Sequence, residues 1–293
     1  MATVGQWLAG ARPRTLSAAV APVAAGTGAA AAADSFIASR ALLALLVAVA
    51  LQVGVNYAND YSDGIRGTDD ERVGPVRLVG QRLAEPMHVK AAALASLAVA
   101  ALAGVLLVAL TGQWWLLAVG AVSMAAAWLY TGGPRPYGYL GLGEIFVFVF
   151  FGPVAVIGTT YVQVESITAL AVGASIPIGL LACLILIANN LRDIPTDRES
   201  GKQTLAVRLG DVRTRSMFTA GAVLTYVVTL ALVPLSAGAL AGLVGALPAA
   251  AAVRDVRSGA VGPALIPVLV RTGVALLLTG LGLGLGFFVV AAL

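Results

Sequence analysis

The strongest constraint on this chain is a series of apolar stretches, each long enough to cross the hydrocarbon core of a bilayer. A crossing helix needs about 20 predominantly apolar residues to span ~30 Å. The sequence predicts nine such helices, at about residues 15–33, 40–59, 90–110, 114–131, 143–162, 167–190, 216–234, 236–252 and 271–292. Only 11% of the 293 residues are charged, whereas soluble domains have about 25%. A water-soluble globule is therefore excluded.

The stretches have the character of helices rather than of barrel strands. The run from Ala91 to Leu110 is apolar on all sides, whereas membrane β-strands alternate apolar and polar residues. Small residues, including 34 glycines, suit helices whose backbones approach closely in lipid. We therefore expect an all-α integral membrane protein, with one domain over residues 1–293 that forms a bundle of nine transmembrane helices.

The charged residues indicate how the bundle is oriented. The N-terminus and the loops after the second, fourth, sixth and eighth predicted helices hold 17 of the 18 basic residues, and Arg40 alone lies on the other side. The positive-inside rule places the basic side in the cytoplasm. Because 12 of the 14 acidic residues lie there as well, we expect a cytoplasmic cap over a central cavity. The bases are dispersed, with no basic helix or aromatic platform, so we expect no nucleic-acid partner.

Two polar motifs follow the second and sixth predicted helices. If helix continues through them, spacings of three and four residues bring the polar side chains of each motif onto one face. The first face holds Asn56, Asn59, Asp60 and Asp63, and the second holds Asn190, Asp193 and Asp197.

Clustered carboxylates near lipid repel one another and are costly to desolvate, so they persist most easily where cations neutralise them. Oxygen ligands of this kind suit Mg²⁺, which keeps several waters and is usually shared with substrate phosphates. A diphosphate between the motifs would also explain the interleaved basic residues, and it favours ionisation of a diphosphate ester. The alternative is a set of ordinary salt bridges at a membrane surface, and the repetition of the motif argues against it. The basic residues are Arg66, Arg72, Arg77, Arg192, Arg198 and Lys202.

These motifs and the helix count resemble the UbiA superfamily of intramembrane prenyltransferases over nearly the whole chain. The sequence is most similar to the branch that prenylates 1,4-dihydroxy-2-naphthoate. One departure is Gly67, where the general superfamily pattern has an Asp, and Asp69 or Asp70 would serve instead. The resemblance rests on Trp7, Ala11-Arg12-Pro13-Arg14-Thr15-Leu16, Asn59-Asp60-Tyr61-Ser62-Asp63, and residues 72–77, 189–193 and 197–210.

The resemblance implies transfer of a polyprenyl group from polyprenyl diphosphate to 1,4-dihydroxy-2-naphthoate, with loss of diphosphate and CO₂, giving a demethylmenaquinone. It implies a bacterial-type cell membrane, Mg²⁺ as cofactor, and catalytic roles for Asp63, Asp193 and Lys202. The implied metal ligands are Asn59, Asp60, Asp63, Asp69, Asp193 and Asp197. The implied substrate-binding residues are Asn56, Arg66, Arg77, Tyr130, Arg135, Tyr137, Asn189, Asn190, Arg192 and Lys202, and Tyr57, Tyr61 and Tyr139 join Tyr130 and Tyr137 as candidates to shield a carbocation.

Three other functions stay open at this point. Another aromatic acceptor, such as 4-hydroxybenzoate, would use the same site. A transporter would also carry charges between helices, but transport sites lie near the midplane rather than at helix ends. A phosphatidyltransferase acting on a CDP-lipid is disfavoured, because Asp63-Gly64 is followed by Ile65-Arg66 instead of the D-G-x-x-A-R pattern of that family. The sequence leaves the oligomeric state open.

Overall fold

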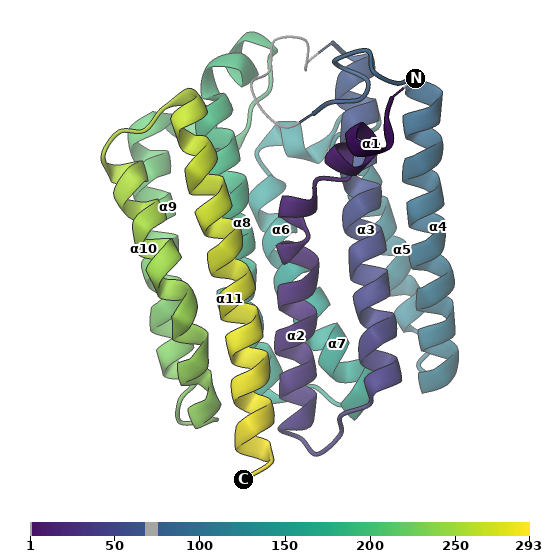
Figure 1. Cartoon of the computed structure of the whole chain (residues 1–293), viewed down its shortest axis with the longest axis vertical. Helices are drawn as coiled ribbons and strands as arrows, with labels where there is room; N and C mark the ends of the chain where they lie inside the picture. The colour runs from purple at the N-terminus through teal and green to yellow at the C-terminus, as the bar shows by residue number, and fades with distance from the viewer. Residues whose placement is uncertain (1, 68–75) are drawn as a thin grey trace.

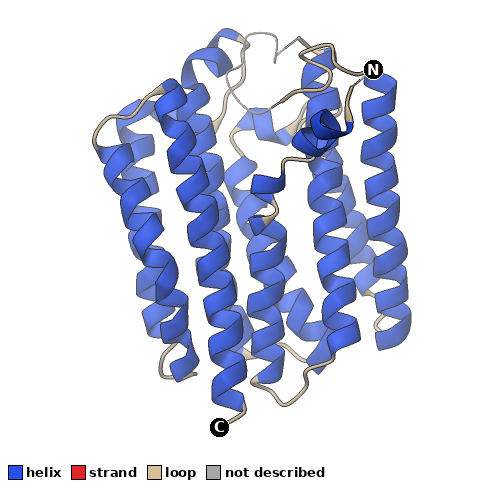
Figure 2. Ribbon diagram, in the orientation of Figure 1, coloured by secondary structure: helices blue, strands red, loops and turns tan. Residues whose placement is uncertain are grey.

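A computed structural model describes residues 2–67 and 76–293 of the chain. Within these ranges every regular element is a helix (Figure 2), which confirms the expected all-α class. The helices stand side by side in one upright bundle, with the N-terminus at one end and the C-terminus at the other (Figure 1).

The α-helices of the bundle are α2 (Ser17–Ala31), α3 (Ala38–Ile65), α4 (Pro86–Thr111), α5 (Leu116–Leu129), α6 (Gly143–Val149), α7 (Ala155–Val164), α8 (Ala169–Glu199), α9 (Leu205–Ala231), α10 (Ala246–Arg257) and α11 (Ile266–Ala291). The other helical segments are α1 (Val4–Gly10), η1 (Pro13–Thr15), η2 (Tyr137–Leu140), η3 (Phe150–Val154), η4 (Ala237–Gly245) and η5 (Gly262–Leu265).

Helical structure overlaps each of the nine ranges expected from the sequence, and several helices extend beyond them. In the described part of the chain, six helical segments are long and apolar enough to cross a membrane. The helices α2 and α5 are apolar but shorter. The count of nine crossings therefore stays a prediction.

Helix α8 is the central element of the bundle. Two thirds (67%) of its most apolar window is buried, compared with 28% to 44% in the other candidate spans. It begins at an N-cap, where the Thr168 hydroxyl accepts a hydrogen bond from the backbone N–H of Ala171 and so satisfies a helix-end donor. Its alkyl side chains form the main core together with residues of α2, α9 and α11.

The segment that runs from α6 to α7 changes its winding in the middle. A π-turn spans Phe150–Val154 and contains Pro153. Proline has no backbone N–H and clashes with the preceding turn, so a helix widens or bends around it. The segment nevertheless stays continuous over residues 143–164.

Helix α11 packs against α2 along a seam of small residues. A Cβ atom built on Gly284 would lie 2.5 Å from the backbone oxygen of Ala24, and one built on Gly28 would lie 2.3 Å from that of Gly284. Contacts this short exclude any side chain at either glycine. The seam shows why the chain is so rich in glycine, because the two backbones approach too closely for larger residues.

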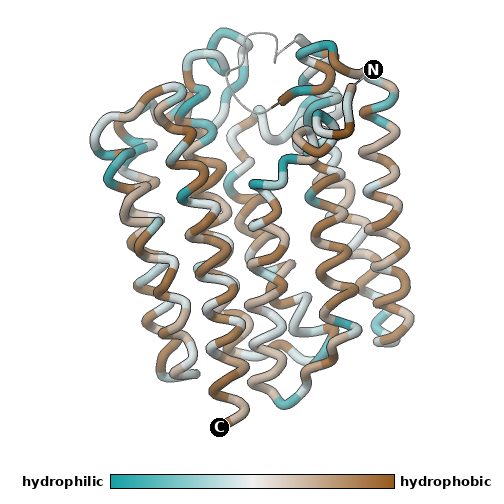
Figure 3. The backbone as a smooth tube through the Cα atoms, in the orientation of Figure 1, coloured by the Kyte–Doolittle hydropathy of each residue, from teal (hydrophilic) through white to brown (hydrophobic). Residues whose placement is uncertain are grey.

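Polar residues gather at the end of the bundle where α3 and α8 finish (Figure 3). The N-terminal helix α1 also lies at this end (Figure 1). Both acidic motifs are therefore brought to the same end, as their positions in the sequence predict.

Candidate active site

The helix continues through both acidic motifs, because α3 ends only at Ile65 and α8 only at Glu199. One turn separates Asn59 from Asp63 on α3, and two turns separate Asn190 from Asp197 on α8. These faces border one cavity of about 90 Å³. Its lining consists of Arg12, Asn59, Asp63, Arg77, Tyr130, Thr131, Gly138, Tyr139, Asn189, Asn190, Asp197, Lys202 and Thr204.

The α3 side of the cavity is held by the connection between α5 and α6. The hydroxyl of Tyr139 donates to Asp63 Oδ1 at 2.5 Å, and the hydroxyl of Thr131 donates to Asn59 Oδ1 at 2.8 Å. Hydrogen bonds to a carboxylate are stronger than those between neutral groups. The connection therefore fixes the rotamers of both polar residues on α3.

Lys202 links the two sides of the cavity. Its Nζ lies 3.9 Å from Asp197 Oδ1 and 4.6 Å from the ring centre of Tyr139. Its backbone N–H donates to the carbonyl of Asp197 at 2.8 Å, just after Gly201, whose φ of 74° reverses the chain beyond α8. Only 6% of Lys202 is exposed, so its charge acts on the cavity rather than on solvent.

Arg12 reaches the cavity from the N-terminal segment. Its φ of 53° lies in the left-handed region, which is costly for a residue with a side chain. The side-chain amide of Asn56 donates to the carbonyl of Ala11 and to the hydroxyl of Thr15, both at 2.9 Å. Asn56, expected to bind substrate, thus fastens the segment that carries Arg12 and does not line the cavity.

Asp60 was expected to bind metal, but the structure gives its carboxylate a different task. One oxygen accepts from the backbone N–H of Leu78 at 2.7 Å and the other from that of Val79 at 3.1 Å. Asp60 is 1% exposed and does not line the cavity. These bonds hold the loop directly after Arg77, a buried residue of the lining.

Asp193 and Arg192 also lie outside the cavity lining. They form a buried two-point ion pair, with distances of 2.7 Å from Arg192 Nε to Asp193 Oδ1 and 2.8 Å from Nη2 to Oδ2. The helical spacing places Asp193 between Asn190 and Asp197, yet its oxygens are engaged by the neighbouring guanidinium. Neither residue therefore forms part of the cavity wall.

The remaining candidates are scattered. The guanidinium of Arg66 donates to the carbonyls of Thr131 and Gly133, and it lies 5.7 Å from the centre of the Tyr139 ring. Arg135 is exposed and does not border the cavity. Asp69 lies outside the described residues.

Tyr130 and Tyr137, both predicted to bind substrate, differ in their contacts. Tyr130 lines the cavity, whereas Tyr137 donates its hydroxyl to the carbonyl of Ala126 at 2.8 Å and stacks on Phe146 with ring centres 4.0 Å apart. Burial raises the pKa of Tyr137, so this hydroxyl remains a neutral donor.

Sequence reasoning missed several residues of the lining. Arg12 and Tyr139 had been singled out, one in a family-like segment and one as a candidate aromatic, but neither was assigned to the diphosphate site. Thr204 stands in the family-like run 197–210 without an assigned role, and Thr131 and Gly138 carry no signal of their own. They reach the cavity because the chain between α5 and α6 and the chain after α8 fold over the ends of the two long helices.

The lining is suited to an anion that binds together with a metal ion. Three cationic side chains and two carboxylates face the cavity. Among the described residues, no group of three His, Cys, Asp or Glu could hold a metal, but Mg²⁺ typically binds one or two carboxylates together with substrate phosphates. Asp63 and Asp197, with the amide oxygens of nearby asparagines, fit that requirement.

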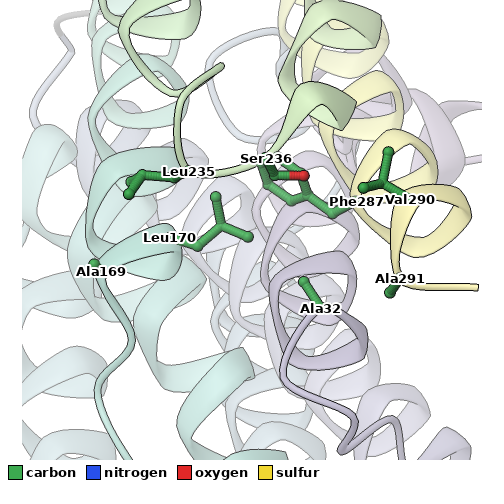
Figure 4. A pocket seen from close by; sticks show the side chains of 8 residues that line it. All are labelled: Ala32, Ala169, Leu170, Leu235, Ser236, Phe287, Val290 and Ala291. Atoms are coloured by element: carbon green, nitrogen blue, oxygen red, sulfur yellow. The ribbon is translucent and has the colours of Figure 1, made fainter. Parts of the chain in front are cut away.

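A larger cavity of about 400 Å³ lies at the opposite end of the bundle (Figure 4). The residues that line it are all described, and none of them carries a charge. It therefore lacks any group that could bind a diphosphate. Its lining is Ala32, Ala169, Leu170, Leu235, Ser236, Phe287, Val290 and Ala291.

Comparison with known families and proteins agrees with this geometry. A family model described as the UbiA prenyltransferase family matches residues 19–262. The 1,4-dihydroxy-2-naphthoate octaprenyltransferase of Mycobacterium tuberculosis is 57% identical over 281 residues, 96% of each chain. The enzyme of the same name from Escherichia coli is 42% identical over 215 residues, 71% of this chain and 70% of that one.

Solved structures share the fold. A UbiA homolog from Archaeoglobus fulgidus, determined with DMAPP and Mg²⁺ bound, has a TM-score of 0.66 at 16% identity and covers 97% of this chain and 99% of its own. An apo UbiA homolog from Aeropyrum pernix has a TM-score of 0.69 at 18% identity, covering 93% and 97%.

Proposed function

This chain belongs to the UbiA prenyltransferase family, and from that membership we propose that it transfers a polyprenyl group from polyprenyl diphosphate to 1,4-dihydroxy-2-naphthoate. Diphosphate and CO₂ leave, and the product is a demethylmenaquinol, the hydroquinone form of a demethylmenaquinone. The observation that carries the proposal is the similarity to the mycobacterial octaprenyltransferase, which extends over nearly the whole of both chains. The charged cavity supports it independently, since it joins carboxylates, amides and cations at one end of an apolar bundle.

Within this proposal, Asp63, Asp197, Asn59 and Asn190 hold Mg²⁺, and Arg12 and Lys202 bind the phosphate oxygens. Bound there, Mg²⁺ would supply Lewis-acid stabilisation of the charge on the diphosphate. Negative charge develops on the diphosphate oxygen while its bond to the allylic carbon breaks. The two side-chain cations also stabilise this charge. The Archaeoglobus homolog was determined with Mg²⁺ bound, which supports a metal-dependent reaction.

The allylic carbocation that forms as the diphosphate leaves needs an electron-rich neighbour. Tyr130 lines the cavity, and an aromatic face attracts a cation. Its ring is also packed edge-on against Tyr137, with centres 5.5 Å apart, which limits its rotation. We assign Tyr130 to this position, because Lys202 already lies over the ring of Tyr139.

The acceptor then attacks through the ring carbon that bears its carboxylate. A carbon–carbon bond forms to the allylic carbon, the bond to the carboxylate breaks, and its electron pair restores the aromatic ring as CO₂ departs. The carboxylate needs a cation to orient it beforehand. Arg77 lines the cavity while Arg135 is exposed, which favours Arg77 for this role.

The chain is a multi-pass membrane protein, and its topology is part of the proposal. We assign it nine crossings in a single domain, with the N-terminus and the active site in the cytoplasm of a bacterial cell. The bias of basic residues supports this orientation. Each CH₂ of a prenyl chain favours lipid over water by about 0.8 kcal/mol, so a substrate of this kind resides in the bilayer.

The test is prenyl transfer by the purified protein in detergent, supplied with Mg²⁺, a polyprenyl diphosphate and either 1,4-dihydroxy-2-naphthoate or 4-hydroxybenzoate. We expect diphosphate release and a prenylated naphthohydroquinone, which air oxidises to the quinone, with the first acceptor only. A product formed with 4-hydroxybenzoate alone would overturn the assignment of 1,4-dihydroxy-2-naphthoate as the acceptor. Turnover in micelles, which enclose no compartment, would also exclude transport as the explanation.

A further inference from the structure

A buried acid, Glu144, lies directly behind the candidate metal site. It is the second residue of α6 and the one charged residue of the segment 143–164. Its Oε1 accepts a hydrogen bond from Asn190 Nδ2 at 3.0 Å. The thiol of Cys183 on α8 donates to the backbone carbonyl of Glu144 at 3.1 Å, so α8 holds this residue at two points.

The bond to Glu144 determines which way the side-chain amide of Asn190 faces. A carboxylate can only accept hydrogen bonds, so Asn190 must turn its NH₂ group toward Glu144. The amide oxygen is then kept for other partners. Asn190 borders the cavity and Glu144 does not, so Glu144 acts on the cavity only through Asn190.

Packing alone gives no reason for an acid at this position. Glu144 is 9% exposed, and its Oε2 is buried without a hydrogen-bond partner among the described residues. Burying a carboxyl group with one oxygen unsatisfied is unfavourable. Carboxylates that hydrogen-bond to metal ligands are a recurrent exception, because they orient the ligand and their loss weakens the site.

We infer that Glu144 is a positioning residue for the Mg²⁺ and diphosphate site. It holds Asn190 with its amide oxygen available to a metal, while the Cys183 contact holds the start of α6 in place. The inference rests on the proposed function, since it assigns Asn190 as a metal ligand.

The test uses the full chain in detergent and measures binding of Mn²⁺, in place of Mg²⁺, by electron paramagnetic resonance in the presence of inorganic diphosphate. We expect Glu144→Ala to weaken Mn²⁺ binding about 10-fold, the usual loss for such a support. Glu144→Gln should stay within about 3-fold of wild type, because its amide oxygen still accepts from Asn190. In the Asn190→Ala background, Glu144→Ala should cause no further loss of Mn²⁺ binding, because both changes remove the same interaction.

Glu199→Gln is the matched control, because it alters an exposed acid on α8 and should leave Mn²⁺ binding unchanged. Gel filtration and thermal unfolding report whether each variant folds. Should Glu144→Ala not fold, Glu144→Met replaces it, since methionine has similar length and no oxygen acceptor.

The inference is overturned by unaltered Mn²⁺ binding in Glu144→Ala, by equal losses in Glu144→Ala and Glu144→Gln, by additive losses in the double variant, or by wild-type protein that binds no Mn²⁺. Failure of the proposed acceptor is a separate result. In that case the binding data follow the expected pattern, but dihydroxynaphthoate yields no prenylated product.

Discussion

The hydroxyl of Tyr139 donates a 2.5 Å hydrogen bond to the carboxylate of Asp63. The ring of the same tyrosine supports Lys202, whose ammonium group also approaches Asp197. A connected set of contacts thus crosses the cavity from α3 to α8. The distance between the two acidic motifs is therefore set by a residue that belongs to neither.

The first prediction concerns this bridge. Tyr139→Phe keeps the ring under Lys202 and removes the hydroxyl that donates to Asp63. A bond to a charged group is worth about 1.5 to 3 kcal/mol, so we expect kcat/KM to fall roughly 10- to 100-fold. Tyr161→Phe is the control, because that hydroxyl contacts Gln113 outside the cavity. Equal activity of both variants would remove Tyr139 from the site.

The second prediction concerns the carboxylates that border the cavity. Asp63→Ala and Asp197→Ala should each lower kcat by more than the 10- to 100-fold typical of residues that only support a metal ligand. Glu199→Ala, at the exposed end of the same helix as Asp197, should retain wild-type turnover. Near-normal turnover in either aspartate variant would contradict the proposed metal site. Membrane insertion, checked by fractionation, should be equal in all three.

The third prediction concerns metal removal. A chelator should abolish prenyl transfer, and added Mg²⁺ should restore it. Ca²⁺ should restore it poorly, because it demands more oxygen ligands and longer bonds than Mg²⁺. Activity that persists after exhaustive chelation would show that the side-chain cations suffice.

The fourth prediction separates Asp60 from the metal ligands. Asp60→Ala removes the acceptor for the N–H groups of Leu78 and Val79 and should release the neighbouring Arg77. We expect kcat/KM to drop about 10-fold and no further loss when the change is added to Arg77→Ala. An additive loss in the double variant would show that Asp60 acts on the reaction by another route.

The fifth prediction concerns the seam between α2 and α11. Gly284→Ala forces a methyl group against the backbone of Ala24, and such overpacking costs about 1 to 3 kcal/mol. The Tm in detergent should fall by several degrees. Gly120→Ala on α5, where no neighbouring atom lies within 4 Å, should leave the Tm unchanged or raise it. A similar Tm for both variants would refute close packing at the seam.

Much of the fold follows from hydropathy, because apolar length determines where helices form. Spacing predicts two shared faces, and of the seven residues assigned to them Asn59, Asp63, Asn190 and Asp197 line the cavity, whereas Asn56, Asp60 and Asp193 do not. Spacing cannot show what each side chain bonds to. Asp60 and Asp193 stand in equally acidic surroundings, yet one holds a loop and the other an arginine.

The contributions of Arg12 and Tyr139 could not be derived from periodicity, because Arg12 caps the short 3-10 helix η1 and Tyr139 lies in the short 3-10 helix η2. Glu144 did leave a signal in the sequence. An acid in a membrane segment that has no other charged residue is a functional candidate by default, and its partner on α8 becomes apparent only when the two helices are placed together.

The lengths of α3 and α8 fix how deep the reaction lies. With 28 and 31 residues, they measure about 42 and 46 Å, which exceeds the ~30 Å hydrocarbon layer. Asp63 and Asp197 each stand two residues before the helix end, and because the helices are longer than the hydrocarbon layer we expect both residues to lie at the level of the lipid headgroups. A prenyl diphosphate can reach them by diffusing within the plane of the membrane, without leaving it. Turnover should then depend on the mole fraction of this lipid in the bilayer, and diluting it with inert phospholipid should slow the enzyme at constant bulk concentration.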